Sequence, residues 1–215
     1  MSEAIAENQT ALDVSSLPAT EFDAHSALWW GNALLLAIET AMFGILIAIY
    51  FSVLMQTEPF PPPRTERLPI LYESYPDLTL PIIGLAVLLV SLVPSILLDL
   101  AARRRYVGWI KVLMPITLLL NIAAIVIRYY EYDSLHFKWA DNAYGSITWM
   151  ILGMHMFHLF VLACEDGYLL AWTYIKGIDD KHALDITVLG VYWYWIVGMW
   201  VLLFGVVYIV PRFTL

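Results

Sequence analysis

The chain has 215 residues, of which 61% are hydrophobic and only 14% are charged. Soluble domains typically have about 45–50% apolar and about 25% charged residues, so these proportions argue against a water-soluble fold. The formal charge of −8 argues against nucleic-acid binding, which requires a basic surface. The single cysteine, Cys164, excludes an internal disulfide and any site built from paired thiolates.

The N-terminal segment, residues 1–26, is polar and acidic and contains no Lys or Arg. It lacks both the basic start and apolar run of a secretory signal and the arginines of a transit peptide. We therefore expect residues 1–26 to be a retained tail that is disordered or extended. The remainder, residues 27–215, is expected to form one domain.

Apolar segments occupy most of that domain, at approximately 28–55, 80–98, 109–127, 146–175 and 186–210. Each can cross a hydrocarbon core of about 30 Å at about 1.5 Å per helical residue. Trp and Tyr residues gather near the segment ends, as is typical of membrane interfaces. The predicted fold is all-α, a polytopic membrane protein with a five-helix transmembrane bundle. The proline-rich connection after the first segment is expected to be an extended surface loop.

The positions of Lys and Arg predict the orientation of the chain in the membrane. The end shared by the tail and by the second and fourth connections has six of them, including the consecutive Arg103, Arg104 and Arg105. The opposite end has five, with Arg128 counted among them. We expect the N-terminus in the cytoplasm and the C-terminus outside.

Glu39 lies near the centre of the first apolar segment. An ionisable group at mid-membrane costs about 2.5–3.5 kcal/mol on insertion scales, so it usually faces protein or water and has a function. Small residues on another side of the same helix predict the closest helix contact there: Ala33, Ala37, Ala41, Gly44 and Ala48. Glu39 is therefore expected to meet a second surface, a lipid cleft or a partner subunit. The alternative is a protonated carboxyl that makes one structural hydrogen bond.

The fourth segment carries His155, His158, Glu165 and Asp166. On a helix these fall within an arc of about 100°, which predicts a polar seam facing the bundle. Glu165 lies about 10 Å beyond His158 along the axis, too far for all four to share one ion, so a hydrogen-bonded seam is favoured over a metal site. In antiparallel helices Glu39 lies in depth between His158 and Glu165, and contact with one of them is predicted.

Two further polar groups are expected to have structural roles. Asn121 in the third segment predicts an interhelical hydrogen bond. Asp99 and Arg103 have the spacing of an i, i+4 ion pair at the end of the second segment.

Three groups of motifs follow one another in the chain. The first group, before a Pro-Pro-Pro loop, is Trp30-Gly31 and Ile38-Glu39-Thr40-Ala41-Met42-Phe43. The second is Asp141-Asn142-Ala143-Tyr144-Gly145-Ser146, followed by Gly153-Met154-His155-Met156-Phe157-His158. The third is Tyr192-Trp193-Tyr194-Trp195, followed by Trp200. In order and spacing they resemble the carboxylate-bearing helix, the "D-x-x-Y-G-S" and "G-F-H-G-L-H" segments and the last helix of subunit III of haem-copper cytochrome oxidases. The resemblance spans residues 29–211 and is closest to the short, five-helix bacterial form.

This resemblance implies structural roles for Asp141, Tyr144, Gly145, Ser146, Tyr192, Trp193 and Trp200. The chain departs from the family at Tyr194, which replaces a His, and at Val197, which replaces an Asp. Glu165 and Asp166 also stand at positions that are usually apolar.

The resemblance also implies a function: a redox-inactive core subunit of a proton-translocating terminal oxidase in the bacterial cytoplasmic membrane. Its expected partners are oxidase subunits I and II and membrane lipid, with cytochrome c or quinol reached only through the complex. Haem and copper are expected in the partner subunits, and no cofactor, metal or catalytic residue is expected here. Glu39 would be the carboxylate that supports proton supply or lipid binding.

Other functions stay open at this stage. The nearest is a relative of subunit III associated with nitric-oxide reductase. A proton-coupled transporter would explain acids in mid-membrane, although such proteins often show internal repeats and broken helices. A membrane metalloenzyme would use His155, His158 and Glu165.

Overall fold

The structure, a computed structural model, describes residues 26–63, 70 and 76–213. Its main helices are α1 (Ala27–Gln56), α2 (Thr79–Arg103), α3 (Val107–Ser134), α4 (Ala143–Ile175) and α5 (Asp180–Phe204). The π-helical segment η1 (Gly205–Ile209) and the short α6 (Val210–Phe213) continue directly from α5. Within the described ranges five helices are long and apolar enough to cross a membrane, so the predicted all-α, five-helix fold is confirmed. Residues 1–25 of the expected tail lie outside the described residues.

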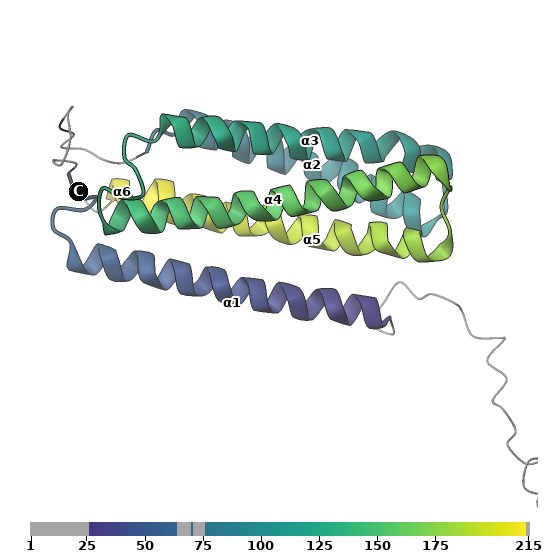
Figure 1. Ribbon diagram of the computed structural model, residues 1–215, viewed down its shortest axis with the longest axis horizontal. Helices are drawn as coiled ribbons and strands as arrows, with labels where there is room; N and C mark the ends of the chain where they lie inside the picture. The colour runs from purple at the N-terminus through teal and green to yellow at the C-terminus, as the bar shows by residue number, and fades with distance from the viewer. Residues whose placement is uncertain (1–25, 64–69, 71–75, 214–215) are drawn as a thin grey trace, which may run out of the picture.

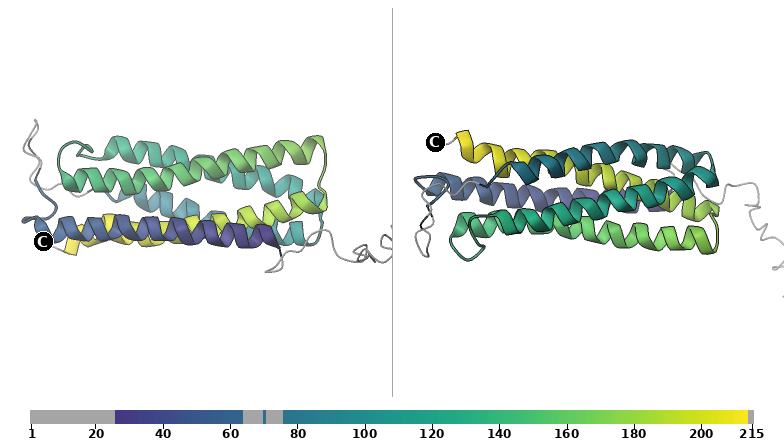
Figure 2. Two further views of the ribbon diagram at one scale, coloured as in Figure 1. Left: turned by 60° about the horizontal axis from the view of Figure 1, so that its bottom comes forward. Right: turned by 90° about the horizontal axis from the view of Figure 1, so that it is seen from above.

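The helices run up and down as a bundle whose two ends are clearly separated (Figure 1). The start of α1, the α2–α3 turn and the α4–α5 turn lie at one end, and the C-terminus lies at the other. Helices α2, α3, α4 and α5 pack together, whereas α1 contacts mainly α4 and, less extensively, α5 (Figure 2). One side of α1 is therefore free of contacts with the rest of the described chain.

The third helix is longer than its apolar run. The run predicts an end near residue 127, but the helix ends at Ser134, and both Arg128 and Glu131 are buried in its last two turns. The placement of Arg128 in an outer loop is therefore wrong. The physical reason is that Glu131 neutralises Arg128 within the same helix, so the positive charge of Arg128 does not end the buried part of α3.

Part of the proline-rich connection is also buried rather than on the surface. Phe60 and Pro61 are buried, and the Phe60 ring packs at 5.8 Å from Tyr50 and 5.2 Å from Tyr144. Phe137 adds a fourth ring, 5.0 Å from Tyr144. This aromatic cluster closes the bundle at the C-terminal end and joins the connection to α1 and α4.

The start of α5 is capped by Asp179. Its carboxylate accepts a hydrogen bond of 2.9 Å from the His182 backbone N–H and also contacts the His182 ring. These bonds from His182 hold the pKa of Asp179 below its usual value of 3.8, because they stabilise the ionised form.

The small-residue stripe of α1 does not make the closest helix contact. Ala37, Ala41, Gly44 and Ala48 are exposed, and a Cβ added at Gly44 would meet no atom within 4 Å. Phe43 and Tyr50, on the other side, are fully buried. The prediction is wrong because the larger side chains of α1, and Glu39 with them, fill the grooves of α4 and α5.

Candidate functional site

Glu39 and His158 form a polar contact between α1 and α4. Glu39 Oε2 lies 3.1 Å from His158 Nε2, and their side chains are 24% and 5% exposed. The predicted contact of Glu39 with His158 or Glu165 is therefore confirmed, through His158. The second surface that Glu39 meets is therefore α4 of its own chain.

The second nitrogen of His158 decides where the hydrogens lie. His158 Nδ1 is 2.6 Å from the carbonyl oxygen of Met154. A carbonyl can only accept, so Nδ1 carries a hydrogen. The contact between Nε2 and Glu39 then needs one more proton, held either by the carboxyl or by the imidazole. The Glu39–His158 pair therefore holds one transferable proton while its net charge stays zero.

Aromatic side chains and a second polar bond fix this pair. The His158 ring lies 5.4 Å from Phe43 and 5.5 Å from Trp195, between ring centres. Trp195 donates its indole N–H at 2.8 Å to the hydroxyl of Thr40, the residue that follows Glu39 in the chain. Since α1 contributes Glu39, Thr40 and Phe43 to one site, these contacts hold α1 against α4 and α5.

His155 belongs to a different part of the interior. Its Nε2 lies 3.2 Å from the Ile196 carbonyl oxygen, and its ring packs 4.8 Å from Trp200. Among the residues that the structure describes, no group of three His, Cys, Asp or Glu side chains could hold a metal ion. His155, His158 and Glu165 therefore do not form a set of metal ligands that would support the metalloenzyme alternative.

The predicted seam of four side chains on α4 is split. Glu165 lines an open cleft of about 630 Å³ beside α1, together with Asn32, Tyr168 and Asp185. Asp166 instead lines a small cavity between α2, α3 and α5. Adjacent residues on a helix point about 100° apart, so these two acids enter different spaces, and the single-face prediction is wrong for Glu165.

A buried charge cluster at the other end of the bundle was not predicted from the sequence. Arg128 Nη1 lies 2.7 and 2.8 Å from the two carboxylate oxygens of Glu131, and the two side chains are 3% and 2% exposed. Tyr208, carried by η1, donates its hydroxyl to Glu131, and Arg128 Cζ lies 3.4 Å from the centre of the Trp200 ring. The i, i+3 spacing of Arg128 and Glu131 was the signal that could have found the pair.

Comparison with known proteins gives the family. The family model described as "Cytochrome c oxidase subunit III" matches residues 16–211. The chain belongs to the cytochrome c oxidase subunit III family. It is therefore a multi-pass membrane protein of a family whose members are subunits of an oxidase complex.

Two relatives of subunit III match over most of their length. The probable cytochrome c oxidase subunit 3 of Mycobacterium leprae is 28% identical over 183 residues, 84% of this chain and 86% of the relative. The cytochrome c oxidase subunit 3 of Thermostichus vulcanus is 25% identical over 194 residues, 85% and 87% of the two chains.

The subunit III motif before α4 builds the turn that starts this helix. The Asp141 carboxylate accepts a hydrogen bond of 2.8 Å from the Lys138 backbone N–H. Asn142 caps α4, because its side-chain oxygen accepts a hydrogen bond of 2.7 Å from the Gly145 backbone N–H. A Cβ at Gly145 would lie 2.5 Å from the Lys138 carbonyl oxygen, so only glycine fits. Ser146 donates to the Trp139 carbonyl at 2.6 Å.

The last subunit III motif packs α5 into the bundle. Tyr192 stacks on Trp195 with ring centres 5.9 Å apart, and Trp193 donates to the Ser91 hydroxyl of α2 at 3.0 Å. Trp200 lies between His155 and Arg128. These contacts fit the structural roles that the resemblance implies.

Proposed function

We propose that this chain is a redox-inactive core subunit of a proton-translocating haem-copper terminal oxidase in aerobic respiration. In this proposal it buttresses the catalytic subunit I, assembles also with subunit II, binds phospholipid and supports proton uptake. Cytochrome c or quinol acts on it only through the complex. Its place is the bacterial cytoplasmic membrane, with the N-terminus in the cytoplasm and the C-terminus in the periplasm.

The observation that carries the proton-supporting role is the Glu39–His158 pair. It holds one transferable proton inside the membrane, and both protonation forms are neutral overall, so moving the proton between them leaves no unpaired charge in the apolar interior. The Glu39 side chain is also 24% exposed, which leaves part of it accessible to a proton donor or to a polar group of a lipid.

The lipid-binding role is supported by the cleft beside α1. This cleft of about 630 Å³ is lined mainly by apolar side chains, among them Leu28, Leu35, Val161 and Val188. Its size and lining suit an acyl chain. The cleft opens between α1 and the α4–α5 pair, so a bound lipid would support the weakly packed first helix.

Haem and copper do not fit the histidines of this chain's spans. Both ring nitrogens of His158 are engaged with Met154 and Glu39. The His155 ring is fully buried against Trp200, with no room beside it for a macrocycle. We therefore assign both cofactors to the partner subunits.

Purification of the tagged chain in mild detergent tests its membership of such a complex. We expect haem absorption and copper to copurify with it, together with subunits I and II. A colourless preparation of this chain alone would contradict the proposal. Copurification with a haem protein that reduces nitric oxide and not oxygen would favour the nitric-oxide-reductase relative.

Carbodiimide labelling tests the proton on the pair, because this reagent modifies protonated carboxyls in apolar surroundings. We expect the label on Glu39 in the intact complex, and no label on the corresponding peptide of Glu39→Gln. A label confined to other acids would contradict the role of Glu39 as proton holder.

A further inference from the structure

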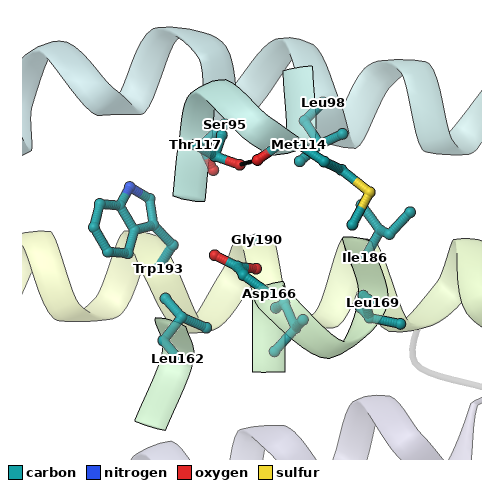
Figure 3. A pocket seen from close by; sticks show the side chains of 11 residues that line it. Ser95, Leu98, Met114, Thr117, Leu162, Asp166, Leu169, Ile186, Gly190 and Trp193 are labelled. Atoms are coloured by element: carbon teal, nitrogen blue, oxygen red, sulfur yellow. Dashed lines mark hydrogen bonds between the residues drawn. The ribbon is translucent and has the colours of Figure 1, made fainter. Parts of the chain in front are cut away.

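Asp166 faces a second interior site that the proposed function does not use. A cavity of about 20 Å³ lies between α2, α3, α4 and α5. Figure 3 shows the Asp166 carboxyl of α4 across this space from Ser95 of α2 and Thr117 of α3. The rest of the lining is apolar apart from the Gly190 backbone and the Trp193 ring.

The carboxyl of Asp166 lacks a partner among the residues that the structure describes. Within the described part of the chain it has neither a hydrogen bond nor an ion pair. Trp193, which also lines the cavity, donates its indole N–H to Ser91 instead. An ionised, unpaired carboxylate inside a membrane bundle is costly, and such a group neutralises by binding a proton.

The described charged groups on the surrounding helices do not supply a counter-ion. On α2, Asp99 and Arg103 pair with each other at 3.1 Å. On α4 and α5, Glu165 and Asp185 line the separate cleft beside α1, and both are acids. Tyr194 of α5 carries no positive charge, and α3 contributes only Met114 and Thr117 to the lining.

The cavity has the size and the polar partners that one water molecule needs. A buried water requires a space of about 10–15 Å³ or more and makes about three hydrogen bonds. Thr117 already donates its hydroxyl hydrogen to the Met114 carbonyl at 2.9 Å, so its oxygen is left to accept. A water can accept from a protonated Asp166 and donate to Thr117 and Ser95, which satisfies all three groups.

We propose that Asp166, Ser95 and Thr117 form a second protonatable site, filled by one water molecule and with Asp166 held as the neutral acid. A divalent cation is less suitable, because Ca²⁺ and Mg²⁺ take about six oxygen ligands or more, whereas these three side chains provide four oxygens. The site is independent of the Glu39–His158 pair.

The neighbouring cleft gives this site a route for proton exchange. Leu169 and Leu189 line both the cavity and the cleft beside α1. Only these apolar side chains are common to the two linings, and Glu165, next to Asp166 in the chain, lies on the cleft side. Displacement of these leucines would connect the cavity with the cleft.

Infrared spectroscopy of the intact complex in lipid nanodiscs tests the proposal. At neutral pH we expect a carbonyl band of a protonated carboxylic acid that is lost in Asp166→Asn. Glu165→Gln, the adjacent acid in the other space, is the matched control and should keep the band. Ser95→Ala and Thr117→Val retain Asp166 and should shift the band, because each removes a hydrogen-bond partner of the water.

Three results would overturn the proposal. The first is a spectrum with no protonated-acid band that depends on Asp166. The second is a band that Na⁺ abolishes, which would identify a cation site. The third is a band that neither Ser95→Ala nor Thr117→Val shifts, which would mean that no water links the three side chains. The Glu39→Gln variant leaves Asp166, Ser95 and Thr117 unchanged and should keep the Asp166 band, so failure here is distinguishable from failure of the proposed function.

Discussion

At the scale of single residues, Arg128 and Glu131 show how two buried charges stabilise each other. Arg128 and Glu131 are almost inaccessible, and each would leave an unpaired charge in the membrane if the other were removed. Tyr208 and Trp200 complete the cluster, one by a hydrogen bond and the other by its ring face. The cluster therefore holds the end of α3 against α5 and η1.

A double-mutant cycle on Arg128 and Glu131 checks this. Either Arg128→Met or Glu131→Leu alone should lower the free energy of unfolding by about 3–5 kcal/mol, because a buried charge is left unpaired. The double variant should lose much less free energy of unfolding than the sum of the losses in the two single variants. Unfolding in mixed detergent micelles gives the values, and strictly additive losses would show that the two side chains do not stabilise each other.

At the scale of helices, the ends of α4 and α5 depend on specific backbone contacts. Asn142 and Asp179 cap the two helices, and Gly145 allows the first turn of α4 to touch the Lys138 carbonyl. Both caps lie outside the apolar runs, in connections that the hydropathy pattern describes poorly.

Substitution of Gly145 by Ala should destabilise the protein by about 1–3 kcal/mol, since the added methyl group overlaps backbone that must move. Gly198→Ala is the matched control, because a Cβ added there would meet no atom within 4 Å outside its own helix. In a helix interior this change should be neutral or stabilising by up to about 1 kcal/mol. Equal thermal stability of both variants would contradict the close contact at Gly145.

The cap at Asp179 should make the first turn of α5 sensitive to acid. Its pKa is lower in the folded protein than the usual 3.8, so its stabilisation is complete above about pH 5 and is lost as the pH falls through the lower, folded value. Hydrogen exchange of this turn, corrected for the intrinsic effect of pH, should show that loss. Asp179→Asn keeps a capping oxygen without an ionisable group, and an unchanged acid response in this variant would contradict the assignment.

The helices could be predicted from the sequence far better than their polar contacts. Hydropathy located all five spans, because length and apolar content suffice for that. Depth along antiparallel helices placed Glu39 near His158. Hydropathy could not show which side of α1 packs inward, since its small and large residues were equally apolar. It also could not show that Arg128 would be buried, because that depends on Glu131 and on Tyr208, about eighty residues later in the chain.

At the scale of the whole molecule, the polar groups lie at different depths in an apolar bundle. The Arg128–Glu131 cluster lies towards the C-terminal end, the Glu39–His158 pair near the middle, and Asp166 and Glu165 further towards the end where α4 meets α5. Since α1 has few contacts apart from those around Glu39 and Tyr50, the bundle is least tightly held on this side. We expect partner subunits or lipid to complete this side in the oxidase complex.

Proton uptake by the complex with Glu39→Gln is the measurement that tests the proton-holding role of Glu39. The glutamine amide can still donate to His158 Nε2 and keep α1 in place, but it removes the transferable proton. We predict slower proton uptake and a several-fold faster loss of activity during turnover, with normal assembly. The exposed acid Asp133, changed to Asn, is the control and should leave both rates unchanged. Uptake and inactivation rates equal to those of the unmodified complex would show that Glu39 does not support proton supply and has a structural role.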